Sequence, residues 1–149
     1  MSEGLPVEVR DCEQTDLARV EEIENASFPD PYSHSLFLQL LLSYPRGFRV
    51  AEIEGQLVGY CILVDPKDND LKIIASIAVD PACRGRGIGS ALLEDAITRA
   101  RIARIVLQVR VDNLAAISLY EKFGFIKTAR IADYYGEGED AFEMLFEAR

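Results

Sequence analysis

The sequence lacks the cysteine and histidine patterns of disulfide-rich and zinc-binding proteins. Its three cysteines, Cys12, Cys61 and Cys83, are far apart and form no CxxC pair, and His34 is its single histidine. An odd number of widely spaced cysteines favours neither a disulfide framework nor a zinc site. We therefore expect reduced thiols and no bound metal.

Long hydrophobic runs are also absent. The longest, such as YCILV at 60–64 and IIASIAV at 73–79, fall far short of the roughly 20 apolar residues that span a membrane. The N-terminal segment MSEGLPVEVR lacks the basic and apolar regions of a signal peptide. These features predict a cytoplasmic protein with no membrane partner.

The sequence has no excess of positive charge. Its formal net charge is -9, and the acidic excess lies in residues 1–80, because residues 81–149 hold 10 acidic and 10 basic residues. An acidic surface repels a phosphate backbone, and no stripe of Lys and Arg interleaves with aromatic residues. Nucleic-acid binding is therefore not expected, although Arg84 and Arg86 form a local basic exception.

Alternating helix and strand patterns run through the chain of 149 residues, of which 49% are hydrophobic. We expect a single domain spanning residues 1–149. Its fold class is predicted to be α/β (α+β), with a mixed, mostly antiparallel sheet and helices on both faces. The periodicity predicts helices at 13–28, 33–44, 88–103 and 113–125, and strands at 5–12, 47–55, 56–65, 70–80, 104–111, 125–133 and 139–148.

A glycine-rich stretch, RGRGIGSALL at 84–93, stands between a predicted strand and a predicted helix. It is not a Walker loop, because no lysine occurs between Lys72 and Lys122. Its G-x-G-x-G spacing also differs from the dinucleotide-binding fingerprint. Glycines at a helix N-terminus let a phosphate approach unpaired N–H groups, so we expect an anion site. The alternative is a glycine-rich turn that only starts a helix.

Three separated motifs resemble the GNAT acetyltransferase superfamily. In IAVDPACRGRGIGSALLEDA at 77–96, Arg84, Gly87 and Gly89 match the pattern [QR]-x-x-G-x-[GA]. The segments LQVRVDNLAAISLYEKFGF at 107–125 and DYYGEGEDAFEM at 133–144 are similar to the more specific motifs of RimI-like protein N-terminal acetyltransferases. The resemblance covers most of the chain from residue 73 onward, and it implies the GNAT fold.

The resemblance also implies a reaction and its donor. An acetyl group would pass from acetyl-CoA to the α-amino group of a protein N-terminus by direct attack. Tyr120 would protonate the departing thiolate, which suits a phenol with a reference pKa of about 10. The residues implied in binding the CoA moiety are Ile77, Ala78, Val79, Arg84, Gly85, Arg86, Gly87, Ile88, Gly89, Asn113 and Tyr120.

Some of these residues have a simpler structural interpretation. Asn113 follows Asp112 and is also suited to cap a helix N-terminus, and both roles are compatible. The periodicity alone makes Tyr120 a core or boundary aromatic. The resemblance places Tyr32, Tyr134 and Tyr135 in the peptide-binding groove, whereas amphipathic tyrosines also occur at sheet edges.

The general base is the point at which the sequence departs from the family. The family commonly has Glu, or in some members His, at the position of Gln108, and an amide does not accept a proton at neutral pH. We assign Gln108 to the substrate site. Asp30, in FPDPYS, occupies a position where some relatives carry a glutamate, so it is a candidate catalytic residue; the alternative is a turn aspartate between two prolines.

The lack of a strong base favours an α-amine over a lysine side chain as the acceptor. Deprotonating an α-amine at pH 7 costs about 1 kcal/mol, whereas deprotonating a lysine side chain costs about 5 kcal/mol. The expected partners are protein or peptide N-termini, including those of ribosomal proteins, with an auxiliary subunit left open. The alternatives are a GNAT enzyme for small-molecule amines or lysine side chains, and a non-catalytic acyl-CoA-binding sensor or partner subunit.

Overall fold

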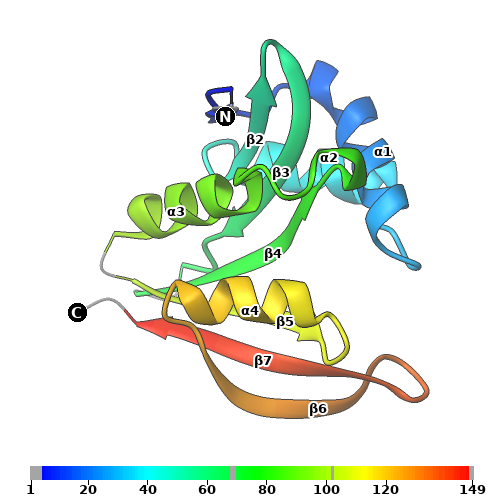
Figure 1. Cartoon of the computed structure of the whole chain (residues 1–149), viewed down its shortest axis with the longest axis vertical. Helices are drawn as coiled ribbons and strands as arrows, with labels where there is room; N and C mark the ends of the chain where they lie inside the picture. Colours follow the sequence, from blue (N-terminus) through cyan, green and yellow to red (C-terminus); the bar gives the residue numbers. More distant parts are fainter. Residues whose placement is uncertain (1–4, 68–69, 102, 148–149) are drawn as a thin grey trace. The chain divides into compact units, whose positions relative to one another are not determined.

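The computed structural model describes residues 5–67, 70–101 and 103–147 (Figure 1). The chain divides into two compact units, Met1–Val64 with Ala75–Ala96 and Asp65–Ile74 with Ile97–Arg149, called here the first and the second unit. The predicted single domain is not tested by this division and stays a prediction. The first four residues of the N-terminal segment lie outside the described residues, as do Ile102 and Ala148 of the predicted elements.

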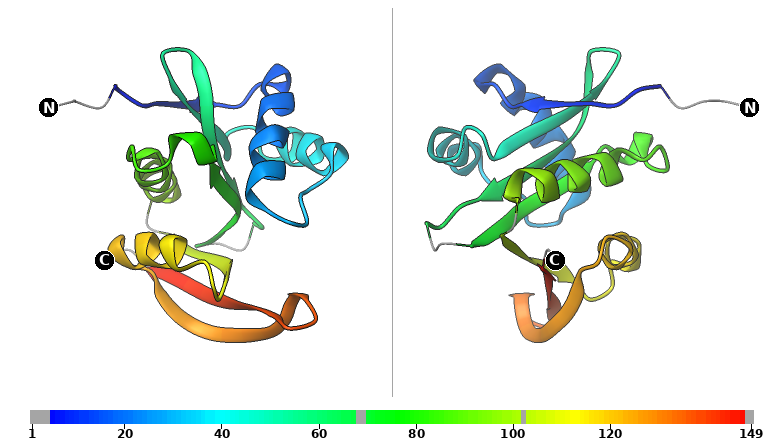
Figure 2. Two further views of the ribbon diagram at one scale, coloured as in Figure 1. Left: turned by 45° about the vertical axis from the view of Figure 1, so that its right-hand side comes forward. Right: turned by 90° about the vertical axis from the view of Figure 1, so that its left-hand side faces the viewer.

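The first unit is an antiparallel meander covered by helices. Its turn between β2 and β3 contains Glu54 and Gly55, whose φ angles of 51° and 79° lie in the left-handed region, as a two-residue hairpin turn requires. Figure 2 shows α1 and α2 on one face of these strands and α3 on the other. The elements are β1 (Glu8–Asp11), a 3-10 turn (Gln14–Asp16), α1 (Leu17–Ser27), α2 (His34–Ser43), β2 (Phe48–Ile53), β3 (Gln56–Val64), the end of β4 (Leu71–Val79), a 3-10 turn (Pro81–Cys83) and α3 (Ile88–Ala100).

The core of the first unit forms where α1 and α2 meet the sheet. The spacing of Leu17, Val20 and Ile23 places them on one face of α1, and each is at most 1% exposed. Phe37 of α2 packs edge-on against Tyr60 of β3 with ring centroids 6.0 Å apart. This packing fixes α1 and α2, and with them the loop that joins the two helices.

The second unit is a smaller sheet with one helix. Phe125, which follows α4, packs on Phe146 of β7 with ring centroids 5.4 Å apart, so α4 lies on the face of the sheet that carries Phe146 (Figure 1). The helix ends at Lys122, and Gly124, two residues later, has a φ of 105° that suits glycine. The elements are the start of β4, β5 (Arg104–Arg110), α4 (Leu114–Lys122), β6 (Ile126–Gly136) and β7 (Glu139–Glu147).

Hydrogen bonds join seven strands in the order β1-β2-β3-β4-β5-β7-β6. Only the pair of β4 and β5 is parallel among the pairs with a described register, and it joins Leu71–Ile73 to Arg104–Val106. The mixed, mostly antiparallel sheet with helices on both faces is therefore confirmed. No helix among the described residues is long and apolar enough to span a membrane.

The last hairpin differs from its prediction in one respect. We predicted a strand that ends at Asp133, but β6 continues to Gly136 with an irregular register after Ile131. Asp133 adopts a φ of 55°, and its N–H donates to Asp140 Oδ1 at 3.0 Å. Because aspartate tolerates this conformation, the strand bends at Asp133 instead of ending, and β6 includes Tyr134 and Tyr135.

Candidate active site

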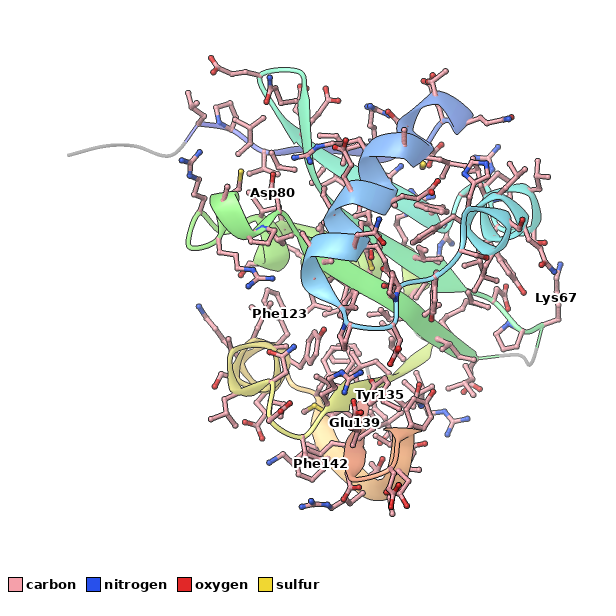
Figure 3. The ribbon with its side chains drawn as sticks, turned by 90° about the vertical axis from the view of Figure 1, so that its right-hand side faces the viewer. Lys67, Asp80, Phe123, Tyr135, Glu139 and Phe142 are labelled. Carbon is pink, nitrogen blue, oxygen red and sulfur yellow. The ribbon has the colours of Figure 1, made fainter. Side chains whose placement is uncertain are left out.

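The end of β4 leads directly into the predicted anion site. Asp80 caps the following 3-10 turn, because its Oδ1 accepts from the Ala82 N–H at 3.0 Å, and its Oδ2 pairs with Arg19 of α1 (Figure 3). These two interactions hold the pKa of Asp80 below its usual range. The turn is thus anchored to α1 before the glycines begin.

The glycine loop has the geometry that an anion site needs. Gly85 and Gly87 have φ angles of 82° and 77°, and a Cβ atom at either would meet no atom within 4 Å. The Ala91 N–H donates to Gly87 O at 3.0 Å, so the N–H groups of Ile88 and Gly89 stand at the helix start, where α-helices lack acceptors. Positive partial charge at this end attracts phosphate groups.

Two side chains complete this loop. Arg84 and Arg86 are exposed, whereas Ile88 is 1% exposed and anchors the first turn of α3 in the core. The loop is therefore anchored in the core by Ile88, and the side chains of Arg84 and Arg86 are exposed to solvent. Upstream on β4, Ala78 is buried, and Ile77 and Val79 are partly buried, which agrees with a strand that also serves the core.

A buried carboxylate, missed by the sequence analysis, connects α1 with the sheet and with the α1–α2 loop in the first unit. Glu24 of α1 is 2% exposed. Its Oε1 accepts from the Tyr60 hydroxyl and from Ser76 Oγ, the latter at 3.3 Å, and its Oε2 accepts from the Tyr32 N–H at 2.9 Å. Burial and the charge of Glu24 raise the pKa of Tyr60 well above its usual value.

The loop between α1 and α2 is tied to β4 by this carboxylate and by Tyr32. The Tyr32 hydroxyl donates to Ala75 O at 2.9 Å, and its ring packs on Phe37 at 5.6 Å. Tyr32 is therefore a structural part of the loop as well as a candidate substrate contact. Asp30, two residues earlier in the same loop, is exposed.

In the second unit, the residues of the second motif lie on β5 and α4. Asn113 caps α4, since its Oδ1 accepts from the Ala116 N–H at 3.2 Å. Tyr120 is 6% exposed and packs on Phe125 at 5.8 Å. The structure thus confirms that Asn113 is a helix cap and that Tyr120 is a core aromatic. The binding of CoA by these two residues stays a prediction.

Gln108 lies on β5 and is directly opposite Glu143 of β7. Sequence reasoning did not single out Glu143, because the pairing register of two strands that are about 35 residues apart is not visible in a single sequence. The only available signal was its place within the third motif. The structure thus places a carboxylate beside the position where the expected base is missing.

Tyr134 and Tyr135 lie near the turn end of the β6–β7 hairpin and pack against each other with centroids 4.8 Å apart. The guanidinium of Arg110 lies over the Tyr135 ring at 4.2 Å and also pairs with Glu139, which lies at the same end (Figure 3). Arg110, which the sequence analysis did not consider, therefore orients Tyr135. Tyr134 is 47% exposed, which suits a residue that contacts a substrate.

The cysteines and the residue types that bind metals are further candidates for reactive groups. The three cysteines are free, and burial raises the pKa of both Cys12 and Cys61 to about 12. Cys83, beside the glycine loop, is partly exposed. Within the described ranges, no three His, Cys, Asp or Glu side chains gather as metal ligands would, and the expected absence of a metal stays a prediction.

Comparison with known proteins shows the family. Residues 17–125 match the model of the Acetyltransferase (GNAT) family, and the chain belongs to this family. An uncharacterized N-acetyltransferase of Methanocaldococcus jannaschii is 40% identical over 92% of this chain and 89% of its own. An N-alpha-acetyltransferase of Sulfurisphaera tokodaii is 32% identical over 95% of this chain and 93% of its own.

Solved structures confirm the predicted fold. Ard1 from Thermoplasma volcanium has a TM-score of 0.91 at 29% identity, covering 96% of this chain and 98% of that one. The ribosomal-protein-S18-alanine N-acetyltransferase of Escherichia coli has a TM-score of 0.83 at 28% identity, with coverage of 95% and 94%. The NatC complex bound to Gag peptide and CoA contains a chain with a TM-score of 0.86 at 26% identity, with coverage of 97% and 100%.

The Glu24 interactions predict graded effects of two substitutions on stability. Glu24→Met leaves the Tyr32 N–H without an acceptor and should lower the free energy of unfolding by about 2–4 kcal/mol. Glu24→Gln should cost only about 1 kcal/mol, because its oxygen still accepts from Tyr32 and its amide donates to the Tyr60 hydroxyl. Urea unfolding and amide exchange at Tyr32 measure both effects. Equal losses in the two variants would contradict this account of Glu24.

Proposed function

We propose that this chain transfers the acetyl group of acetyl-CoA to the α-amino group of protein N-termini. The observation that carries the proposal is the open glycine loop at the N-terminus of α3, with its left-handed Gly85 and Gly87. Similarity to N-alpha-acetyltransferases along nearly the whole chain supports the same function.

The donor site uses backbone groups and two arginines. The pyrophosphate of acetyl-CoA accepts hydrogen bonds from Gly85, Gly87, Ile88 and Gly89, with Arg84 and Arg86 neutralising its charge. The backbone of Ile77, Ala78 and Val79 binds the pantetheine arm, and the Asn113 amide contacts the same co-substrate. The NatC structure, with CoA bound, supports this choice of donor.

The reaction is a direct acyl transfer. The neutral amine nitrogen attacks the thioester carbonyl, and an N–H near Val79 stabilises the oxyanion that develops there. The C–S bond breaks as the N–C bond forms, and the departing thiolate takes a proton from the Tyr120 hydroxyl. The amine loses one proton during the attack.

The acceptor is an α-amine because such an amine needs little help from a base. Its deprotonation at pH 7 costs only about 1 kcal/mol. Tyr32, Gln108, Tyr134 and Tyr135 bind the peptide backbone. Asp30, in the α1–α2 loop, receives a proton through water or attracts the incoming ammonium group.

The proposed partners are protein N-termini in the cytoplasm, including those of ribosomal proteins. The name of the E. coli structure, a ribosomal-protein-S18-alanine N-acetyltransferase, supports a ribosomal target. NatC is a complex, which supports the idea of an auxiliary subunit for this chain as well.

The decisive experiment compares two peptides that differ only at the N-terminus. One has a free α-amine and an internal lysine, and the other has the same sequence with a blocked α-amine. Incubation with acetyl-CoA and mass spectrometry should show acetylation of the free peptide at its N-terminus alone. Acetylation of the internal lysine in both peptides would favour a lysine acetyltransferase. No reaction with either, while CoA still binds, would favour a non-catalytic sensor.

The glycine loop predicts a specific effect of Gly87→Ala on donor binding. Alanine at a φ of 77° is strained, and its Cβ occupies space left for phosphate. The Kd for CoA, measured by calorimetry, should rise at least about tenfold. Gly55→Ala is the matched control, because Gly55 also has a positive φ of 79° and open space but lies in the β2–β3 turn. The same loss of affinity in both variants would contradict the assignment of the glycine loop to donor binding.

The assignment of the acid predicts the behaviour of Tyr120→Phe. The ring keeps its packing on Phe125, but the proton donor is lost. The value of kcat should fall about 100-fold, with the Kd for acetyl-CoA within about threefold of the wild type. Tyr44→Phe, at the end of α2, removes a hydroxyl elsewhere and should leave kcat unchanged. Full turnover by Tyr120→Phe would remove Tyr120 from the reaction.

A further inference from the structure

The pairing of β5 with β7 places a carboxylate next to the position where the general base is missing. Gln108 and Glu143 are directly opposite in the antiparallel ladder. Residues opposite one another project from the same face, with Cβ atoms about 4.5–5.5 Å apart. The Glu143 carboxylate is therefore within reach of the atoms that a group at Gln108 would contact.

Glu143 is held in place from the neighbouring strand. The Thr128 hydroxyl lies 2.9 Å from Glu143 Oε1 and 3.3 Å from Glu143 O, so it can donate to either oxygen. A register irregularity between Lys127 and Ala129 aims Thr128 at this point. Because Thr128 contacts one carboxylate oxygen, it orients the group and leaves the other oxygen to interact with a substrate or a water.

The two arginines of β5 on this face of the second unit are paired with carboxylates other than Glu143. Arg110, one position further along the face from Gln108, pairs with Glu139. Arg104, at the far end of the same face, pairs with Asp70 at 3.6 Å and has Glu147 opposite it in the ladder. Glu143 has the uncharged Gln108 opposite it, so it is the carboxylate in the middle of the face and has no cation directly across the ladder.

The proposed acid lies on the opposite face of the same strands. Leu107 alternates with Gln108 and pairs with Met144, and both are buried. Phe146 shares that second face and packs on Phe125, which in turn packs on Tyr120. Glu143 and Tyr120 thus lie on opposite faces of the β5–β7 ladder.

We propose that Glu143 is the general base of the acetyl transfer, in the role that Gln108 does not fill. Glu143 then takes the proton in place of Asp30, and Asp30 attracts the incoming ammonium group. This proposal rests on the N-terminal acetyltransferase function proposed above. As the amine nitrogen bonds to the acetyl carbon, its proton passes to the Glu143 carboxylate. The C–S bond breaks, and the thiolate takes the Tyr120 proton. Glu143 then releases its proton to water, and the Tyr120 phenolate regains one from water.

The proposal gives the two residues distinct tasks. A carboxylate accepts a proton at neutral pH, whereas the Gln108 amide can only donate or accept hydrogen bonds. Gln108 orients the amine or a bridging water, and Glu143 takes the proton. The proposed base of this chain therefore lies on β7, whereas the family commonly has it on β5, and both positions are on the same face of the sheet.

The test is a set of three variants assayed with a free N-terminal peptide. Glu143→Gln should lower kcat/KM for the peptide at least about tenfold and leave the Kd for CoA unchanged. The double variant Gln108→Glu with Glu143→Gln returns a carboxylate to β5 and should recover activity to within about threefold of the wild type. Glu147→Gln, two positions further on the same face, is the control and should stay within about twofold.

Two results would overturn the role of Glu143. The first is Glu143→Gln activity equal to that of the wild type. The second is a loss in Glu143→Gln that the double variant does not recover while urea unfolding shows all variants folded, since a structural loss would not respond to moving the charge. Failure of the proposed function is distinct, because the wild-type chain would then acetylate no peptide N-terminus.

Discussion

The buried carboxylate of Glu24 is the interaction on which the first unit depends. It joins α1 to β3, to β4 and to the α1–α2 loop through Tyr60, Ser76 and the backbone of Tyr32. A buried charge is costly unless its acceptor positions are filled, and here both of its oxygens accept. The requirement to satisfy one charge therefore fixes three segments, one of which carries Asp30.

In the second unit, the strand register determines which side chains contact one another. Because antiparallel partners share a face, the pairing of β5 with β7 decides which side chains meet, independently of their distance in sequence. Gln108 meets Glu143, and Arg110 lies where it contacts both Tyr135 and Glu139. The strand register therefore determines which polar side chains lie together in this unit, in addition to the residue types that the sequence motifs supply.

Local patterns predicted most of the fold, because helix and strand periodicity and glycine turns are short-range signals. The helix predicted at 13–28, whose Leu17, Val20 and Ile23 are buried on one face, and the strands predicted at 47–55 and 56–65 are examples that the structure confirms. Motif resemblance supplied the family, whereas the glycines at a predicted helix N-terminus by themselves predicted an anion site. Glu24 and Glu143 were missed, because Tyr60 and Ser76, which contact Glu24, and Gln108, which is opposite Glu143, are about 35 or more residues away from them. The bend at Asp133 also escaped prediction, since it depends on Asp140 across the hairpin.

The unequal environments of the three cysteines have a practical consequence. Cys12 and Cys61 are buried thiols with pKa values near 12, so they carry almost no thiolate at neutral pH. Cys83 is partly exposed and directly precedes Arg84 at the start of the glycine loop. A thiol-reactive fluorophore would therefore attach first beside the proposed donor site, which gives the sequence as it stands a position for an optical reporter of co-substrate binding.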